Sequence, residues 1–581
     1  MKKNKISNFA KGLVLSVALI LAASCNLEDH LVNPSTLTPD QAGKDFLFNG
    51  IQLNLAGFFL TATQFGMDNS RMLNMFGSTY ENAYTANNFN GLWSSAYSDI
   101  MVNANLLLDL TKEDPATTEL EYNAYFQGAT KIMKAYVLVT LVDYFGKIPY
   151  SKAFNTKDYN PTADDGATVY NDALAMLNAA IVDMNAVAGQ PLIPKPIQDM
   201  YYDRDQAKWI RLANTIKLKI YLQRRRVDVA GSTAAIDALL ALPAATGVIN
   251  SRADEFLFTS SANSQSNPNT YHPWFFNNYQ TSAGQYMSNS YMLELLNGKG
   301  STTDPRIRFY FYRQVTSPTT DVNELACSSA TSPPAHYPPG TAYCQLPGGY
   351  WGRDHLNNEG TPPDGLKRTT YGLYPAGGAF DASQAVPVGG ATGLTLGAAG
   401  RGIIPIMMFS YVTFMRAEHE LTLKGNSAAA RVLLNQAVRE SINRVYTFNV
   451  SVLPTVGPVY TTIVAPASFA TLTNSYVAGV LANYDAGVPV APNTSVPDNQ
   501  LDVLIREYWV ALWGNGVEAY NTIRRTGKPT KMQPALNPTP GNFYRSFIYP
   551  AVYVIRNSSA VQKPDNKVKV FWDTLPDGIL F

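Results

Sequence analysis

The feature that most constrains the fold is GATKIMKAYVLVTLVDYFG, residues 128–146. From Ala129 to Tyr144, apolar and small residues recur at intervals of three and four, which places them on one face of an α-helix. Gly146 and Pro149 follow, and both residue types end helices. A helix with so long an apolar face has to pack against other helices, so the sequence predicts a helical core.

The rest of the chain divides into helical and irregular parts. The same spacing predicts helices over 44–65, 91–111, 168–187, 205–228, 408–424, 427–445 and 498–526. Between 249 and 404 this spacing fades, and Gly, Pro, Ser, Thr, Asn and Tyr dominate. Long irregular segments in compact proteins are uncommon and are often functional. We therefore expect a helical scaffold, 44–248 and 405–530, an irregular insertion, 249–404, and an irregular tail, 531–581.

The first 24 residues have the order of a secretory signal peptide: basic, then apolar, then small. The apolar run from Leu13 to Leu21 is too short to span a bilayer, and we expect no later run to be long enough. Cys25 follows three small residues and resembles the cysteine of a bacterial lipobox, which predicts a lipid anchor. The alternative is ordinary signal cleavage with no role for Cys25. Residues 25–43 then form a tether to a single domain, 44–581.

The charge and the cysteine content limit which partners and which cell compartment fit this chain. Charged residues are only 15%, and removal of the four lysines of the signal peptide lowers the formal net charge from +1 to −3. Nothing in this balance favours a nucleic acid as partner. Cys327 and Cys344 lie in a Pro- and Gly-rich segment of an exported chain. A disulfide between them would contribute about 3 kcal/mol, and two free thiols are the alternative.

Several segments resemble the SusD/RagB family, most closely its second, SusD-like branch. They are KAYVLVTLVDYFGKIPYSKAF (134–154), DQAKWIRLANTIKLKIYLQ (205–223), FMRAEHELTLKG (414–425) and LIREYWVALWGNGVEAYNTIRRTGKP (504–529). The last is the most specific, and it carries the family residues Trp513, Gly514, Gly516, Glu518, Arg524, Arg525, Thr526, Gly527 and Pro529. FYRSFIYPAVYVIRN (543–557) is a looser match that lacks the usual Glu.

The resemblance implies a mostly α fold, in which tetratricopeptide-like helix pairs form a SusD-like α/α superhelix and a long irregular, partly β insertion carries the ligand surface. It implies a lipid-anchored protein exposed at the cell outer membrane. There it would bind oligosaccharides, or in some members oligopeptides, and pass them to a SusC-like TonB-dependent outer-membrane barrel. No cofactor is implied.

Enzyme motifs are incomplete in this chain. Glu418-His419-Glu420 lacks the second histidine of a zinc-protease motif, and Gly298 to Ser301 lacks the first glycine of a phosphate-binding loop. The five histidines have no metal-ligand spacing, so no metal is expected. A pair of catalytic carboxylates is defined only in space. A surface glycan-active enzyme therefore stays an alternative, as does a protein whose aromatic surface meets only the barrel.

Sugar recognition needs flat aromatic rings for the apolar face of the sugar and planar polar groups for its hydroxyls. The insertion supplies both, so it predicts a ligand site formed by Tyr271, Trp274, Asn278, Tyr350, Trp351 and Arg353. We expect Trp274 and Trp351, flanked by Pro, Gly and Asn, to be exposed; the alternative is that the aromatic residues pack the insertion onto the helices. The same surface could hold an extended peptide.

The family also uses the loop between the first two helices for ligand contacts. In this chain that loop is GMDNSRMLNMFGSTYENAYTANNFNGLW, residues 66–93. By resemblance, Asp68 and Arg71 would supply a carboxylate and a guanidinium to the ligand. Trp93 opens a predicted helix, so we expect it to serve packing.

Overall fold

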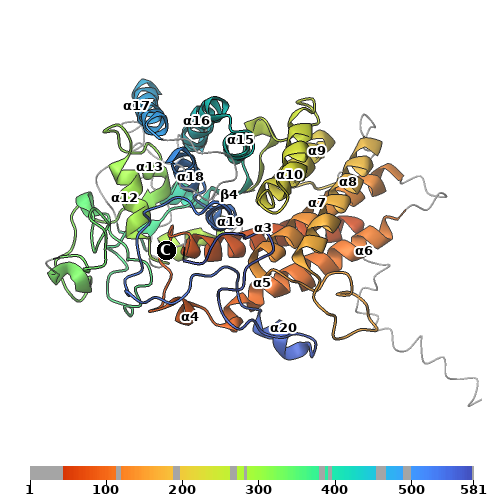
Figure 1. Ribbon diagram of the computed structural model, residues 1–581, viewed down its shortest axis with the longest axis horizontal. Coiled ribbons are helices and arrows are strands. Elements are labelled where there is room, and N and C mark those ends of the chain that lie inside the picture. The colour runs from red at the N-terminus through yellow and green to blue at the C-terminus, as the bar shows by residue number, and fades with distance from the viewer. Residues whose placement is uncertain are drawn as a thin grey trace, which may run out of the picture.

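Helices form most of the structure, a computed structural model in which residues 43–112, 120–187, 197–261, 271–280, 284–330, 332–377, 387–389, 396–452, 466–487 and 499–578 are described. Cys25, the signal peptide and nearly all of the tether lie outside the described residues. Figure 1 shows helices on the right and at the top, with the irregular insertion on the left. The expectation of a mostly α fold is confirmed.

The first helical group contains the helix predicted from residues 128–146. Its elements are α3 (Lys44–Asn69), α4 (Tyr80–Ala83), α5 (Asn90–Ser94), α6 (Val102–Leu110), α7 (Leu120–Phe145), α8 (Gly166–Ala186), α9 (Gln206–Gln223) and α10 (Val229–Leu240). Consecutive helices from α6 to α10 pack side by side, as in a stack of helix pairs. The predicted helix 91–111 is interrupted by a π-helical segment, Ser95–Met101, between α5 and α6.

The second helical group packs above the first. It consists of α15 (Phe409–Thr422), α16 (Ser427–Val452), α17 (Pro466–Asp485), α18 (Asn499–Ala511) and α19 (Gly516–Thr526). The prediction of one helix over 498–526 is wrong. Gly514 has a φ of +87°, which ends α18, and the Asn515 side chain accepts a hydrogen bond from the Glu518 backbone N–H, which starts α19.

α19 joins the two groups because it lies directly on α3. Gly66 of α3 and Gly516 of α19 approach so closely that a Cβ on Gly66 would lie 2.0 Å from the Gly516 carbonyl oxygen. Beside them, Asp143 of α7 accepts hydrogen bonds from Lys219 of α9 at 3.0 Å and from Asn521 of α19 at 2.7 Å. The most family-like segment, 504–529, is thus largely core.

By length and composition alone, α3 is long and apolar enough to cross a membrane. The expectation that no run after the signal peptide has this length is therefore wrong for α3. Half of its most apolar window is buried inside the fold, where it contacts α6, α7 and α19. We interpret it as the central core helix.

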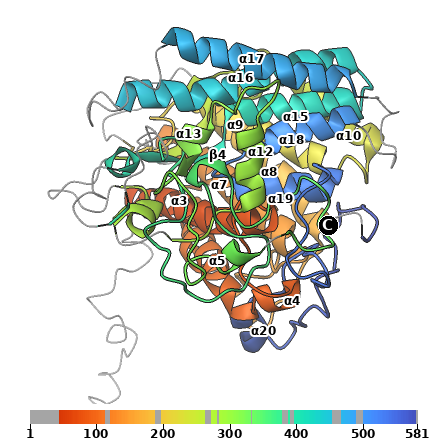
Figure 2. The same ribbon diagram turned by 90° about the vertical axis from the view of Figure 1, so that its left-hand side faces the viewer.

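The insertion has little regular structure. β1 (Phe256–Ser260) pairs antiparallel with β4 (Gly402–Met407), and β2 (Phe311–Tyr312) pairs antiparallel with β3 (Thr370–Tyr371). Short helices α11 (Pro273–Phe275), α12 (Asn289–Asn297) and α13 (Ile307–Tyr310) lie between them, and α20 (Ala551–Arg556) follows in the tail. Figure 2 faces this side and shows long loops in front of α3.

Candidate functional site

Extended segments from distant parts of the chain lie side by side next to the end of α3. The Asn74 N–H donates to the Tyr286 carbonyl oxygen at 2.9 Å, and the Arg353 N–H donates to the Met287 carbonyl oxygen at 2.9 Å. The Thr369 N–H donates to the Trp351 carbonyl oxygen, also at 2.9 Å. Backbone hydrogen bonds and isolated β-bridges therefore join the loop after α3 to several segments of the insertion, and β3 follows directly after Thr369.

Where these segments meet, aromatic rings and guanidinium groups alternate in a row. The guanidinium carbon of Arg353 lies 5.8 Å from the ring centroid of Phe76 and 3.7 Å from that of Tyr286. Arg368 lies 3.6 Å from the same Tyr286 centroid. Such cation–π contacts fix the orientation of both partners. Phe76, at the outer end of this row, is 54% exposed.

A chain of planar polar groups runs beside the row. Exposed Gln64 donates to Gln285 Oε1 at 2.8 Å, and Gln285 Nε2 donates to Asp68 Oδ1 at 2.8 Å. The Tyr84 hydroxyl donates to Asp68 Oδ2 at 2.6 Å. Burial raises the pKa of Asp68 to about 8, despite these hydrogen bonds, which favour the ionised form. Together with Phe76 and Tyr286, the residues Gln64, Asp68 and Gln285 form what we call the candidate binding surface.

Arg71, which was expected to meet a ligand, lies within the fold. Its φ is +59°, its Nε donates to the Gln533 carbonyl oxygen at 2.8 Å and its Nη2 donates to the Tyr80 hydroxyl at 2.9 Å. Burial lowers its pKa. In this arrangement Arg71 connects the loop after α3 to the C-terminal tail.

The aromatic residues near α11 are also packed. Trp274 is buried with its ring centroid 5.0 Å from that of Tyr371, in an edge-to-face contact. Asn278 Nδ2 donates to the Tyr371 carbonyl oxygen at 2.9 Å. Tyr271 is half-buried and contacts Phe275. The expectation that Trp274 is exposed is wrong, because Trp274 belongs to the main hydrophobic core, which the insertion shares with the helices.

The same correction applies to Trp351, which is fully buried. It packs with Leu325 and with Cys344, which forms a disulfide with Cys327 across a Cα–Cα distance of 5.6 Å. Neighbouring Tyr350 is buried, with its ring 5.2 Å from the Arg313 guanidinium carbon. Trp351 was expected to be exposed because of flanking glycines, but here the glycines allow close backbone packing: a Cβ on Gly352 would lie 2.1 Å from the Met287 carbonyl oxygen.

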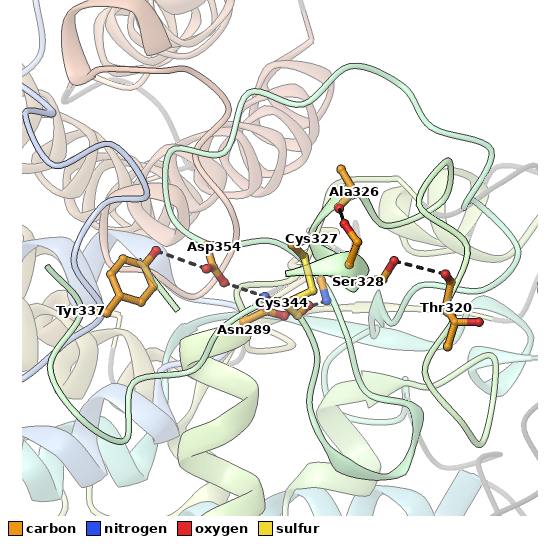
Figure 3. The surroundings of a disulfide bond; sticks show 10 residues. Asn289, Thr320, Ala326, Cys327, Ser328, Tyr337, Cys344 and Asp354 are labelled. Atoms are coloured by element: carbon orange, nitrogen blue, oxygen red, sulfur yellow. Dashed lines mark hydrogen bonds between the residues drawn. A yellow bond between two sulfur atoms is a disulfide. The ribbon is translucent and has the colours of Figure 1, made fainter. Parts of the chain in front are cut away.

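Figure 3 shows the polar contacts around this disulfide. Asp354 accepts hydrogen bonds from Asn289 Nδ2 at 2.7 Å and from the Tyr337 hydroxyl at 3.2 Å. Burial raises the pKa of Asp354 to about 6. The disulfide and Asp354 together hold the loop 327–344 against α12.

Arg353 lies next to the candidate binding surface, but its guanidinium binds backbone carbonyl groups of the protein itself. Its Nη1 and Nη2 donate to the carbonyl oxygens of Glu359 at 2.5 Å and Gly360 at 2.8 Å. The structure thus gathers the predicted residues in one region of the insertion and turns most of them inward.

Five residues of this region were not predicted: Gln64, Phe76, Gln285, Tyr286 and Arg368. Phe76 carries a signal in the sequence, because it is an aromatic residue followed by Gly77 in a loop. The other four carry none, since their position depends on contacts between segments far apart in sequence, as the 217-residue separation of Gln285 and Asp68 illustrates.

The residues of the incomplete zinc-protease motif make contacts within the protein. Among the described residues, no group of three or more His, Cys, Asp and Glu side chains could hold a metal ion. Glu418 of the incomplete zinc motif is paired with Arg525, and His419 contacts Asp237 Oδ1 at 2.9 Å.

A stack of helix pairs that carries an irregular insertion defines a mostly α architecture. Residues 35–327 match the SusD-like family described as "Starch-binding associating with outer membrane", and residues 401–569 match the family described as "Susd and RagB outer membrane lipoprotein". The first match alone spans half of the chain. The chain therefore belongs to the SusD/RagB family.

Solved structures share the fold at low sequence identity. A SusD/RagB family protein from Bacteroides thetaiotaomicron has a TM-score of 0.61 and 18% identity, over 92% of this chain and 99% of its own. A chitin-binding SusD homologue from Flavobacterium johnsoniae has a TM-score of 0.56 and 19% identity, over 91% and 99%. A sequence comparison with curated proteins gives no match.

Proposed function

We propose that this chain is a lipid-anchored protein of the cell surface that captures oligosaccharides and passes them to a SusC-like TonB-dependent outer-membrane transporter. It would bind its cargo without converting it chemically. Family membership supports the location, because the matched families are described as outer-membrane proteins and lipoproteins. The description of the first family as starch-binding, and the name of the chitin-binding homologue, support a carbohydrate as the ligand.

The observation that carries the proposal is the exposed Phe76 ring, which Arg353 links to Tyr286, the neighbour of Gln285 in the Gln64–Gln285–Asp68 chain. A sugar ring offers an apolar C–H face that stacks on an aromatic ring and a rim of hydroxyls that hydrogen-bond to carboxamides. Arg353 fixes Phe76 from behind, and Asp68 fixes Gln285. Because these groups are already oriented, a ligand would meet them with little loss of conformational entropy.

This site differs from the one predicted by sequence. We propose that Phe76, Gln64 and Gln285 make the direct contacts, and that Arg353 and Asp68 hold them in position. Tyr271, the half-buried residue near α11, would lie at the edge. Trp274, Asn278, Tyr350, Trp351 and Arg71 would support the surface from within.

Isothermal titration of the exported domain against starch and chitin oligosaccharides, and against a peptide library, tests this proposal. Phe76→Ala should weaken oligosaccharide binding by about tenfold, the effect of losing one stacked ring. Leu366→Ala is the matched control, because Leu366 is a similarly exposed apolar residue of the insertion, at 52% against 54%. Binding of peptides alone would move the ligand class to oligopeptides. Release of reducing sugar from a polysaccharide would contradict pure binding.

The anchor and the transporter need separate tests. Labelling with radioactive palmitate should be lost in Cys25→Ala, and labelling that persists would contradict an anchor at Cys25. Purification of the lipidated protein from outer membranes should bring down a barrel of the TonB-dependent class. A complex that forms with no such barrel would contradict the proposed partner.

A further inference from the structure

Two grooves meet on the face formed by α5, α6 and α20. One encloses about 560 Å³ beside Trp93, Tyr97 and Tyr553, and the other encloses about 580 Å³ along α6. Val102 and Phe154 line both, so the two grooves are continuous. We call this continuous feature the α6 groove. Each half lies within the range of small-molecule sites, roughly 300–1,000 Å³.

One wall of the α6 groove is a stack of aromatic rings. The ring centroids of Tyr553 and Trp93 are 4.8 Å apart at 28°, and those of Trp93 and Tyr97 are 4.7 Å apart at 30°. Phe154 extends the stack, 6.3 Å from Tyr97 at 29°. Tyr159 stands at the rim and is 83% exposed. The stacked rings thus form an apolar wall, and the exposed Tyr159 ring offers a face to the flat apolar side of a ligand.

The charged groups of the α6 groove balance one another in sign, because Asp158 and Arg556 line one half and both lysines of the other half pair with carboxylates. Lys112 pairs with Asp109, and Lys131 pairs with Asp183 Oδ2 at 2.7 Å. The remaining polar lining includes the carboxamides of Asn105 and Gln127. Paired charges offer little to an ionic ligand, whereas carboxamides beside aromatic rings suit one that is uncharged and rich in hydroxyls.

We propose that the α6 groove is a second binding site, which takes a neutral oligosaccharide. Its ligand class rests on the proposed function. The place of the groove does not rest on it, because in Figure 1 α6 lies on the right and α5 and α20 lie below the centre, whereas the irregular insertion lies to the left. The joined halves form an elongated groove, which fits a chain-like ligand better than a monosaccharide.

Binding of chitohexaose and maltohexaose to variants of the exported domain tests the second site. Tyr159→Ala removes the exposed ring, and Val102→Lys places a long side chain at the junction of the halves, where Val102 is 45% exposed. Ile555→Ala is the matched control, because Ile555 is 83% exposed in the same α20 region and does not line the groove. Hydroxyl-radical footprinting reads out protection of Tyr159 and Phe154 directly.

The expected result is two sites per chain in the unmodified protein, with one lost or weakened about tenfold in Tyr159→Ala and in Val102→Lys. Tyr159 and Phe154 should be protected by either hexasaccharide, and Ile555→Ala should bind normally. One site that only Phe76→Ala weakens would overturn the α6 groove and keep the proposed function. No binding of any oligosaccharide would overturn both. Protection of Tyr159 without ligand would show the groove to be filled by the chain's own tether and overturn the proposal.

Discussion

The guanidinium carbon of Arg353 lies 3.7 Å from the ring centroid of Tyr286. Arg368 lies 3.6 Å from the same centroid, and two groups so close to one centroid must occupy opposite faces of the ring. Tyr286 therefore has neither face left for a ligand. Its hydroxyl donates to Asp364 Oδ2 at 2.6 Å, which fixes the ring in its plane. Tyr286 is the centre of the candidate binding surface without being its contact point.

Arg353→Met should destabilise the protein. The variant keeps the apolar length of the side chain but loses two charged hydrogen bonds to backbone carbonyls and two ring contacts. We expect a loss of about 2–3 kcal/mol in the free energy of unfolding, measured by urea denaturation. Arg556→Met, at an exposed position of α20, is the control and should be neutral. Equal stability of the two variants would contradict the role assigned to Arg353.

Glu418→Gln should be costly because Glu418 is fully buried between two arginines. Arg525 Nε and Nη2 each donate to it at 2.8 Å, and Arg225 Nη1 lies 2.8 Å from its Oε1. Removing this carboxylate leaves buried guanidinium groups without a counter-charge, which costs about 3–5 kcal/mol. The matched control is Asp485→Asn, which breaks an exposed bidentate pair with Arg431 and should cost less than about 1 kcal/mol. Similar losses in the two variants would show that burial of the Glu418 pair is unimportant.

Asp68 should make stability depend on pH. Its pKa is raised by burial from 3.8 to about 8, so between these values the folded state holds a proton that the unfolded state has released. Stability from this group is complete below its unfolded pKa and is lost as pH rises toward the folded pKa. The variant Asp68→Asn has no carboxyl to titrate at this position. Its free energy of unfolding, minus that of the unmodified protein, should therefore increase as pH rises from 3.8 to about 8. Urea denaturation at a series of pH values checks this, and parallel curves would refute it.

Loss of the disulfide should loosen one loop before the whole fold. Cys327 and Cys344 are 17 residues apart, and closing a loop of that size contributes about 3 kcal/mol. In the variant Cys327→Ser with Cys344→Ser, amide hydrogen exchange should speed up from Leu325 to Trp351, since Trp351 packs on Cys344. Exchange in α7, far from the loop, serves as the internal control. Unchanged exchange in the loop would mean that Asp354 and its partners suffice to hold it.

The scaffold could be predicted from the sequence because it follows local patterns. The spacing that opened the argument ends at Phe145 in the structure, one residue before the glycine that predicted its end. The break at Gly514 was missed, although Gly514-Asn515-Gly516 carries ordinary turn signals, because the apolar spacing continues across it. Periodicity reports which residues share a face, but not whether one helix or two present it.

The candidate site could be predicted only as a region. The insertion is rich in aromatic and planar polar side chains, but Trp274 turns into the main core and Trp351 into a small cluster with Leu325 and Cys344. Which ring faces solvent is decided by hydrogen bonds between segments far apart in sequence, such as Asn74 to Tyr286. No local pattern encodes that pairing, so Tyr286 and Arg368 could not be found.

The position of α3 has a mechanical consequence. Its 26 residues span roughly 39 Å at 1.5 Å per residue. It begins at Lys44, where the predicted tether ends, and finishes at Asn69, next to Asp68 of the candidate binding surface. A continuous helix packed along its length is stiff, so a pull on the tether would travel to the far end of α3 instead of being absorbed in a loop. A chain anchored at Cys25 would thus be held at the N-terminal end of α3 and would meet its ligand next to the C-terminal end of the same helix.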